Sequence, residues 1–233
     1  MRIHRVQTYV LSVVALAVAY LAQGALAQTS VSASVYGAFS GTTNGNGTRQ
    51  SPANQAGGLL EVRHISNPIL GFEATYSFNR ANQTYTTSPP GACPTIGCSS
   101  STESVAANAH EVTADWVPSV HIANLRPFGV LGVGLLLDVP SNSTATVTTI
   151  NPCPVCATPA GTTTATSTDS TSTTYKPVYV YGAGLDWGLL PHIGLRLQYR
   201  GNLYSSPNLT SLFSSTSTFT HTAEPMVGIY FRL

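Results

Sequence analysis

The residues best suited to chemistry in this 233-residue chain are its few charged side chains. Ten of them stand at alternate positions of segments in which apolar and polar residues alternate: Glu61, Arg63, Glu73, Glu111, Asp115, Asp186, Arg196, Arg200, Glu224 and Arg232. Alternate residues of a β-strand point to the same face. Lysine, which a water-facing surface would favour, is absent from this set, and arginine can hold a carboxylate through two parallel hydrogen bonds. We therefore expect a network of ion pairs on one face of a sheet.

The four cysteines form a second reactive group, and each pair is local in the sequence: Cys93 with Cys98, and Cys153 with Cys156. In an exported protein these pairs favour disulfides, although crossed pairings stay open. The second pair also has the spacing of redox and zinc CxxC motifs. No βαβ pattern surrounds it and no histidine clusters near it, so we expect neither a cofactor nor a metal.

The N-terminus indicates export. Arg2 and Arg5 precede an apolar run over 10–22, and a small-x-small cleavage site, Ala-Leu-Ala, follows. This pattern predicts a signal peptide over 1–27 and one mature domain over 28–233. A retained membrane anchor is the alternative, but the apolar run is shorter than the ~20 residues that a spanning helix needs.

The composition of the mature chain gives no support for nucleic-acid binding or for a transmembrane helix. Charged residues make up 8% of the sequence, against roughly 25% in an ordinary soluble domain. Without the signal peptide, eight basic residues face nine acidic ones, which gives a net charge of −1 and no basic patch for nucleic acid. No later segment has 18 consecutive apolar residues, so no transmembrane helix is expected.

Eight segments alternate in polarity over about ten residues each, as the strands of membrane barrels do. They are 30–40, 57–65, 69–80, 106–117, 127–138, 175–188, 193–204 and 220–233. Long connections follow the odd segments and short ones follow the even segments, as expected for outer loops and periplasmic turns. The sequence predicts an all-β fold, an eight-stranded antiparallel up-and-down transmembrane β-barrel. The long stretches 42–47 and 160–174 are expected to bury little and to stay mobile, since turn-forming and small polar residues dominate them.

Side chains fill the interior of an eight-stranded barrel. We therefore expect the ten charged residues to form an ion-paired plug across the lumen instead of lining an open channel. Aromatic residues would mark the two membrane interfaces, and core aromatics of a soluble β-sandwich are the alternative. The expected girdle residues are Phe39, Tyr76, Phe78, Trp116, Tyr175, Tyr179, Trp187 and Phe231.

These segments resemble the small outer-membrane barrel superfamily of the OmpA, OmpX and opacity-protein type. The resemblance covers 30–233 and is carried by 67–78, 182–186, 193–200 and the closing Gly-Ile-Tyr-Phe-Arg-Leu of 228–233. The usual terminal Phe is here Leu, with Phe two residues earlier. The resemblance implies a place in the bacterial outer membrane, with its lipid and lipopolysaccharide and the barrel-assembly machinery as partners. It identifies a fold but no activity.

Three functions compete. The first is a non-enzymatic surface protein whose loops serve a structural or adhesive role and meet an extracellular ligand. The second is a small pore for ions or small solutes. The third is a lipid A-modifying enzyme, because His64-Ile65-Ser66-Asn67 matches the His-x-Ser-Asn of PagL-type deacylases and Glu73 could orient the histidine. The expected topology places Ser66 in a periplasmic turn, away from outer-leaflet lipid A. We therefore expect no enzyme.

Overall fold

The computed structural model describes residues 28–87, 102–141, 145–150, 162–167, 172–211 and 213–233. The proposed signal peptide and the four cysteines, Cys93, Cys98, Cys153 and Cys156, lie outside these residues. In the described part, no helix is long and apolar enough to cross a membrane.

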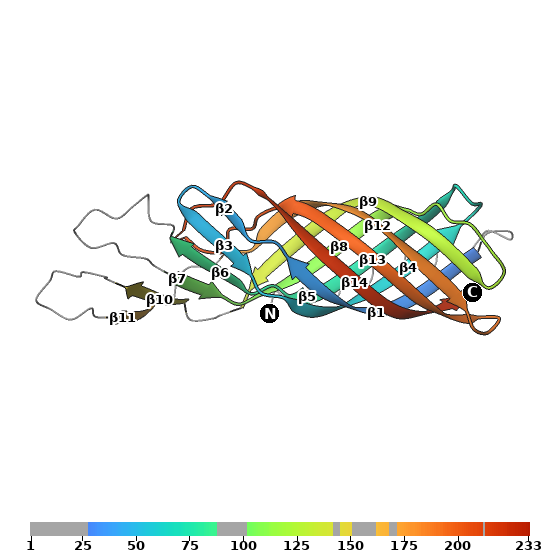
Figure 1. Cartoon of the computed structure of the whole chain (residues 1–233), viewed down its shortest axis with the longest axis horizontal. Helices are drawn as coiled ribbons and strands as arrows, with labels where there is room; N and C mark the ends of the chain where they lie inside the picture. Colours follow the sequence, from blue (N-terminus) through green and yellow to red (C-terminus); the bar gives the residue numbers. More distant parts are fainter. Residues whose placement is uncertain (1–27, 88–101, 142–144, 151–161, 168–171, 212) are drawn as a thin grey trace, which may run out of the picture.

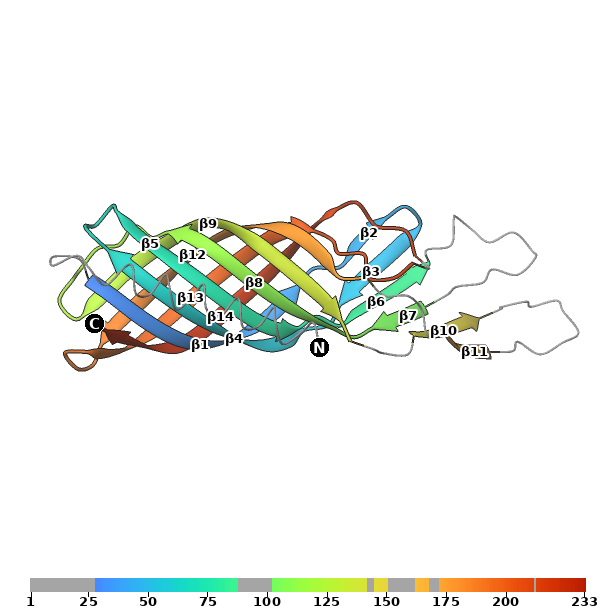
Figure 2. The same ribbon diagram turned by 180° about the vertical axis from the view of Figure 1, so that it is seen from behind.

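Eight antiparallel strands close into a barrel, in the order β1-β4-β5-β8-β9-β12-β13-β14, with β14 paired back to β1 (Figure 1). The strands are β1 (Gln28–Ser40), β4 (Gln55–Ile65), β5 (Gly71–Arg80), β8 (Ala107–Trp116), β9 (Leu125–Pro140), β12 (Thr174–Gly188), β13 (Ile193–Ser205) and β14 (Phe219–Arg232). All eight expected segments are confirmed as barrel strands. Figure 2 shows from behind that the strands are tilted on this side of the barrel as well.

The alternation of side chains explains why these segments form a barrel in lipid. On β5, for example, Phe72 and Phe78 point outward and are exposed, whereas Glu73, Thr75 and Ser77 point inward and are buried. Closure also gives every strand two hydrogen-bonded neighbours, so no strand edge is left unpaired in a solvent without water.

The two rims of the barrel differ. Short turns over 66–70, 117–124 and 189–192 join strands at the rim that carries the C-terminus, and the long connections lie at the opposite end (Figure 1). In the first turn the Asn67 side-chain oxygen accepts hydrogen bonds from the backbone N–H groups of Ile69 (3.0 Å) and Leu70 (2.8 Å). Such side-chain bonds fix a tight turn before the next strand.

The long connections build a second structure beyond the barrel. Strands β2 (Thr43–Gly45), β3 (Thr48–Pro52), β6 (Gln83–Thr87) and β7 (Thr102–Val105) form a four-stranded sheet, and β10 (Ala145–Ile150) pairs with β11 (Thr162–Ser167) in a separate hairpin. We call the four-stranded sheet, with the connection 206–218 that packs on it, the outer cap.

The stretch 42–47, which was expected to bury little, has one buried residue and four exposed ones, but it is folded as β-structure. Thr43 is buried, and the segment forms the β2–β3 hairpin. Asn46 (φ 49°) and Gly47 (φ 72°) both adopt the left-handed conformation, as the two central residues of a type I′ hairpin turn require. The Asn-Gly pair was a visible hairpin signal. In the stretch 160–174, residues 162–167 form β11.

Tyr85 of β6 is the centre of the outer cap. Its ring is buried and stacks on Phe213 at a centroid distance of 6.0 Å. Its hydroxyl donates to the Pro207 carbonyl (3.0 Å) and accepts from the Leu209 N–H (3.1 Å). Burial raises the pKa of Tyr85, so the hydroxyl stays protonated and keeps both bonds. This one side chain therefore fastens the connection 206–218 onto the sheet.

Replacing Tyr85 by Ala should open the outer cap without unfolding the barrel. Loss of a buried aromatic ring costs about 3–5 kcal/mol in a packed core, and the cap contains no membrane-spanning strand. We expect trypsin to cleave at the exposed Arg49 of β3 at least tenfold faster, while the heat-modifiable gel shift of the folded barrel is retained. Thr84→Ala, on the other face of β6, should be cleaved at the wild-type rate. Equal rates in all three proteins would contradict this role of Tyr85.

Candidate functional site

The lumen of the barrel gathers the charged residues that the sequence placed on one face. Nine are buried: Glu61, Arg63, Glu73, Glu111, Asp115, Asp186, Arg196, Arg200 and Glu224. The tenth, Arg232, is half-buried near the rim of short turns. The arginines decide the character of the site, because Arg63, Arg196 and Arg200 are only 0%, 1% and 0% exposed. A lumen filled with water would leave these side chains accessible.

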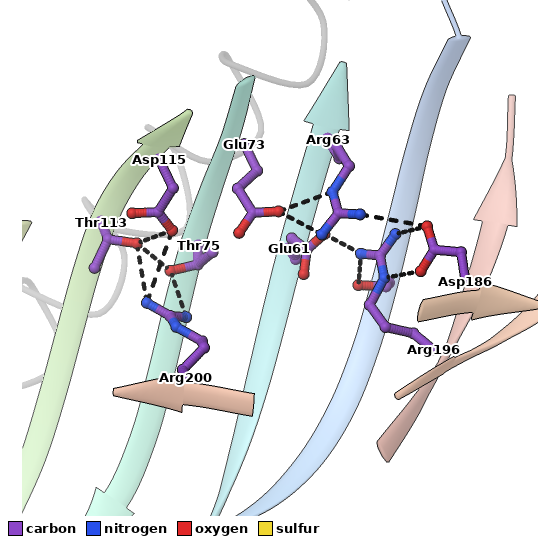
Figure 3. A network of polar contacts seen from close by, with 10 residues as sticks. Glu61, Arg63, Glu73, Thr75, Thr113, Asp115, Asp186, Arg196 and Arg200 are labelled. Atoms are coloured by element: carbon purple, nitrogen blue, oxygen red, sulfur yellow. Dashed lines mark hydrogen bonds and ion pairs between the residues drawn. The ribbon is translucent and has the colours of Figure 1, made fainter. Parts of the chain in front are cut away.

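Two arginines and three acids form one cluster (Figure 3). We call it the inner cluster, because Asp186 and Arg196 stand on either side of the short turn 189–192. Arg196 holds Asp186 through two bonds, from Nε to Oδ1 (2.6 Å) and from Nη2 to Oδ2 (2.7 Å), and it also pairs with Glu61. Arg63 pairs with Glu73 (2.7 Å) and reaches Glu61 (3.1 Å) and Asp186 (3.3 Å). Each arginine thus bridges acids from different strands, and the five side chains form one continuous network.

A third arginine organises the outer cluster, nearer the outer cap. Arg200 lies 3.3 Å from Glu111 and 3.8 Å from Asp115. Its guanidinium also donates to the hydroxyls of Thr75 and Thr113, both at 3.3 Å (Figure 3). Thr113 in turn donates to Asp115 (2.8 Å). Because Arg200 faces two acids, the threonine hydroxyls supply additional hydrogen bonds to Arg200 and to Asp115.

An aromatic ring completes the inner cluster. The Arg63 guanidinium lies 3.9 Å from the centre of the Phe128 ring, and Arg196 lies 5.5 Å from it. Cations bind favourably over aromatic faces at such distances. Gly184 stands opposite Phe128 in the register, and a Cβ there would lie 2.8 Å from Cε2 of that ring. The glycine therefore gives the ring its place in the lumen.

Phe128 and Asp138 are two of the lumen residues that were missed from the sequence. Both are buried on β9. They are an even number of residues apart and therefore share a face with Gly132 and Leu136. The alternation that places these residues on the lumen face could be seen in the sequence, but the many apolar residues of β9 obscured it.

A family model described as outer membrane protein beta-barrel domain matches residues 10–231. The chain belongs to this family. No curated protein matches the chain. Membership of this family places the protein in the bacterial outer membrane. The short turns then lie at the periplasmic rim and the outer cap lies on the cell surface, as in other barrels of this kind.

Several solved barrels are similar to this outer-membrane protein at low sequence identity. Ail of Yersinia pestis is 13% identical, with 89% of this chain and 99% of Ail covered and a TM-score of 0.40. The neisserial surface protein A is 12% identical, with 88% and 97% covered and a TM-score of 0.43. OprG of Pseudomonas aeruginosa is 10% identical, with 91% and 98% covered and a TM-score of 0.46. The family assignment rests on the sequence match alone.

The expected girdle residues all lie on the outside of this outer-membrane barrel. Seven are exposed, namely Phe39, Phe78, Trp116, Tyr175, Tyr179, Trp187 and Phe231. The eighth, Tyr76, is half-buried and shares a hydrogen bond of 2.8 Å with Nδ1 of His110. The indole N–H of Trp116 donates to the Ile69 carbonyl (2.6 Å). An apolar outer face with polar tips bonded to the protein suits the interface between lipid and water.

The residues of the deacylase-like motif do not meet. His64 is half-buried, and its Nδ1 shares a hydrogen bond with the Thr29 hydroxyl (3.0 Å). Ser66 is exposed in the periplasmic turn. Glu73 is buried in the lumen and engaged by Arg63. In the described residues no group of three His, Cys, Asp or Glu side chains could hold a metal ion.

Replacing Arg196 by Met tests the energetic weight of the inner cluster. The variant leaves Glu61 and Asp186 without this cation inside the lumen, and removal of one partner of a buried pair costs about 3–5 kcal/mol. We expect the free energy of unfolding, measured by urea titration in phospholipid vesicles, to fall by roughly that amount.

Arg232→Met is the matched control. Arg232 is half-buried and has no carboxylate within ion-pair distance among the described residues. Its loss should cost less than about 1 kcal/mol. Equal losses for the two variants would contradict a stabilising network at Arg196.

Proposed function

We propose that this outer-membrane protein is a non-enzymatic surface protein, in which a closed barrel anchors outer loops for structural or adhesive contacts. The observation that carries the proposal is the burial of Arg63, Arg196 and Arg200 across the lumen. A lumen occupied by paired charges gives no continuous path for solutes, so the accessible part of the molecule outside the lipid is its loops.

The form of the loops supports a contact role. Much of the long connections is ordered as β-structure beyond the barrel end (Figure 2). The outer cap has its own buried residues, including Tyr85, Val105 and Leu209. An ordered surface loses less conformational entropy when it binds than a flexible one does.

A small pore is the second candidate, and the polarity of the lumen favours it. Its gate would have to involve the buried arginines and their acids, because these side chains fill the cross-section. We place the pore second because each opening would separate several buried ion pairs at once.

The third of the four long connections provides a test of the contact role. Replacing residues 141–172 with a short Gly-Ser linker should preserve barrel assembly, since all eight barrel strands lie outside this segment. We expect cells that express the variant to lose attachment to glass and cell–cell aggregation, when both are normalised to the amount of folded protein. Trp116→Phe, at the periplasmic rim, should leave both behaviours unchanged. Wild-type attachment after the deletion would exclude this loop as the contact surface.

The enzyme alternative is tested directly at Ser66. We expect purified lipid A to remain fully acylated after incubation with the refolded wild-type protein, and the same result with Ser66→Ala, because His64 bonds to Thr29. Mass spectrometry of the lipid provides the measurement. Release of a fatty acid by the wild type that disappears in Ser66→Ala would establish a deacylase and overturn the proposal.

A further inference from the structure

The three short periplasmic turns expose apolar side chains and carry no charged ones. The turns 66–70, 117–124 and 189–192 contain no Asp, Glu, Lys or Arg. Each turn exposes two large apolar residues: Ile69 and Leu70, Val120 and Ile122, and Leu189 and Leu190. Apolar side chains grouped on a surface indicate contact with a protein or a membrane. This rim continues the lipid-facing band, because the indole of Trp116 is bonded to the Ile69 carbonyl.

Two arginines make the periplasmic mouth of the lumen positive. Arg126 of β9 and Arg232 of β14 stand on the lumen face at the periplasmic ends of their strands, and both are half-buried. Among the described residues neither has a carboxylate within 4 Å. Asp186 stands opposite Arg126 in the register, but Arg196 already holds both of its oxygens. The mouth therefore has two positive charges that no acid of the described chain pairs.

Arg232 lines a pocket between two of the turns. The lining consists of His121, Ala123, Asn124, residues 188–191 and Arg232, and it includes no acid. The Gly188 N–H donates to the Asn124 carbonyl (2.8 Å), and Nη2 of Arg232 would lie 3.6 Å from a Cβ at Gly188. The guanidinium thus lies where the two turns meet. The volume of the pocket is about 320 Å³, and pockets for small ligands begin at about 300 Å³.

The guanidinium of Arg232 has hydrogen-bond donors to spare. Among the described residues its one acceptor is the Tyr230 hydroxyl, to which Nη2 donates (3.1 Å). A guanidinium carries five N–H donors in a planar fork that matches a phosphate group. The same pocket is lined by the exposed Leu189 and Leu190. A ligand that joins a phosphate to apolar chains would satisfy both parts of the lining.

We propose that this rim binds the headgroup of an anionic phospholipid from the periplasmic leaflet. Arg232 holds the phosphate, and the acyl chains lie against Leu190 and the lipid-facing band. Positive charge without acids selects an anionic headgroup over a zwitterionic one, and the apolar turns select a lipid over free phosphate. Binding at this rim would fix the depth of the barrel in the membrane, and it does not depend on the role of the outer loops.

Native mass spectrometry of the refolded protein released from nanodiscs tests the proposal. The discs contain phosphatidylglycerol and phosphatidylcholine in equal amounts. We expect each wild-type chain to retain one phosphatidylglycerol in preference to phosphatidylcholine. Arg232→Gln should retain about fivefold less, the factor expected when one arginine is lost at an anionic lipid surface. Arg49→Gln makes the same change at an exposed arginine of the outer cap and should behave as the wild type does.

A second variant separates a lipid site from a phosphate site. Leu190→Ser keeps the charge and alters an exposed turn, so it should show the heat-modifiable gel shift of the folded barrel and yet retain less phosphatidylglycerol. Inorganic phosphate, equimolar with the lipid, should not displace it from the wild type. Equal retention of the two lipids, equal retention by Arg232→Gln and Arg49→Gln, unchanged retention by Leu190→Ser or displacement by phosphate would each overturn the proposal.

Discussion

The ion pairs that cross the lumen are the interaction on which the rest of the structure depends. Two of them follow the strand register directly, since Arg63 stands opposite Glu73 and Arg196 opposite Asp186 in neighbouring strands. A slip of one residue would turn these charges toward lipid and their apolar neighbours into the lumen. Pairing of charges and closure of the barrel therefore select the same register.

The same alternation shapes the outside of the molecule. Residues between the charged positions form the apolar band and its aromatic rims, so one sequence pattern gives a lipid-facing outer surface and a buried, charged interior. The outer cap is stabilised in a different way. Its strands are short, and its stability rests on buried residues such as Tyr85 and Leu209 and on hydrogen bonds to the connection 206–218.

The barrel strands were predictable because the alternation of polar and apolar residues is a local property. It can be read in each strand separately, as in β5 around Glu73. Which arginine meets which acid was not predictable. Arg63 and Asp186 lie on β4 and β12, which are not neighbours in the barrel, and meet only because the lumen is narrow. The outer cap was missed because its sheet joins two different connections, β3 of one to β6 of the other. The in-phase Asp138 of β9 was overlooked within an apolar strand.

Single-channel conductance of the refolded mature protein in a planar bilayer tests the central claim most directly. The ion-paired lumen predicts no discrete openings from wild-type protein that the heat-modifiable gel shift shows to be folded. It also predicts openings from a variant in which Glu61, Asp186 and Arg196 are all replaced by Ala, because this removes three of the five side chains of the inner cluster and leaves Arg63 still paired with Glu73. Reproducible openings of the wild type, similar to those of the triple variant, would contradict a plugged lumen.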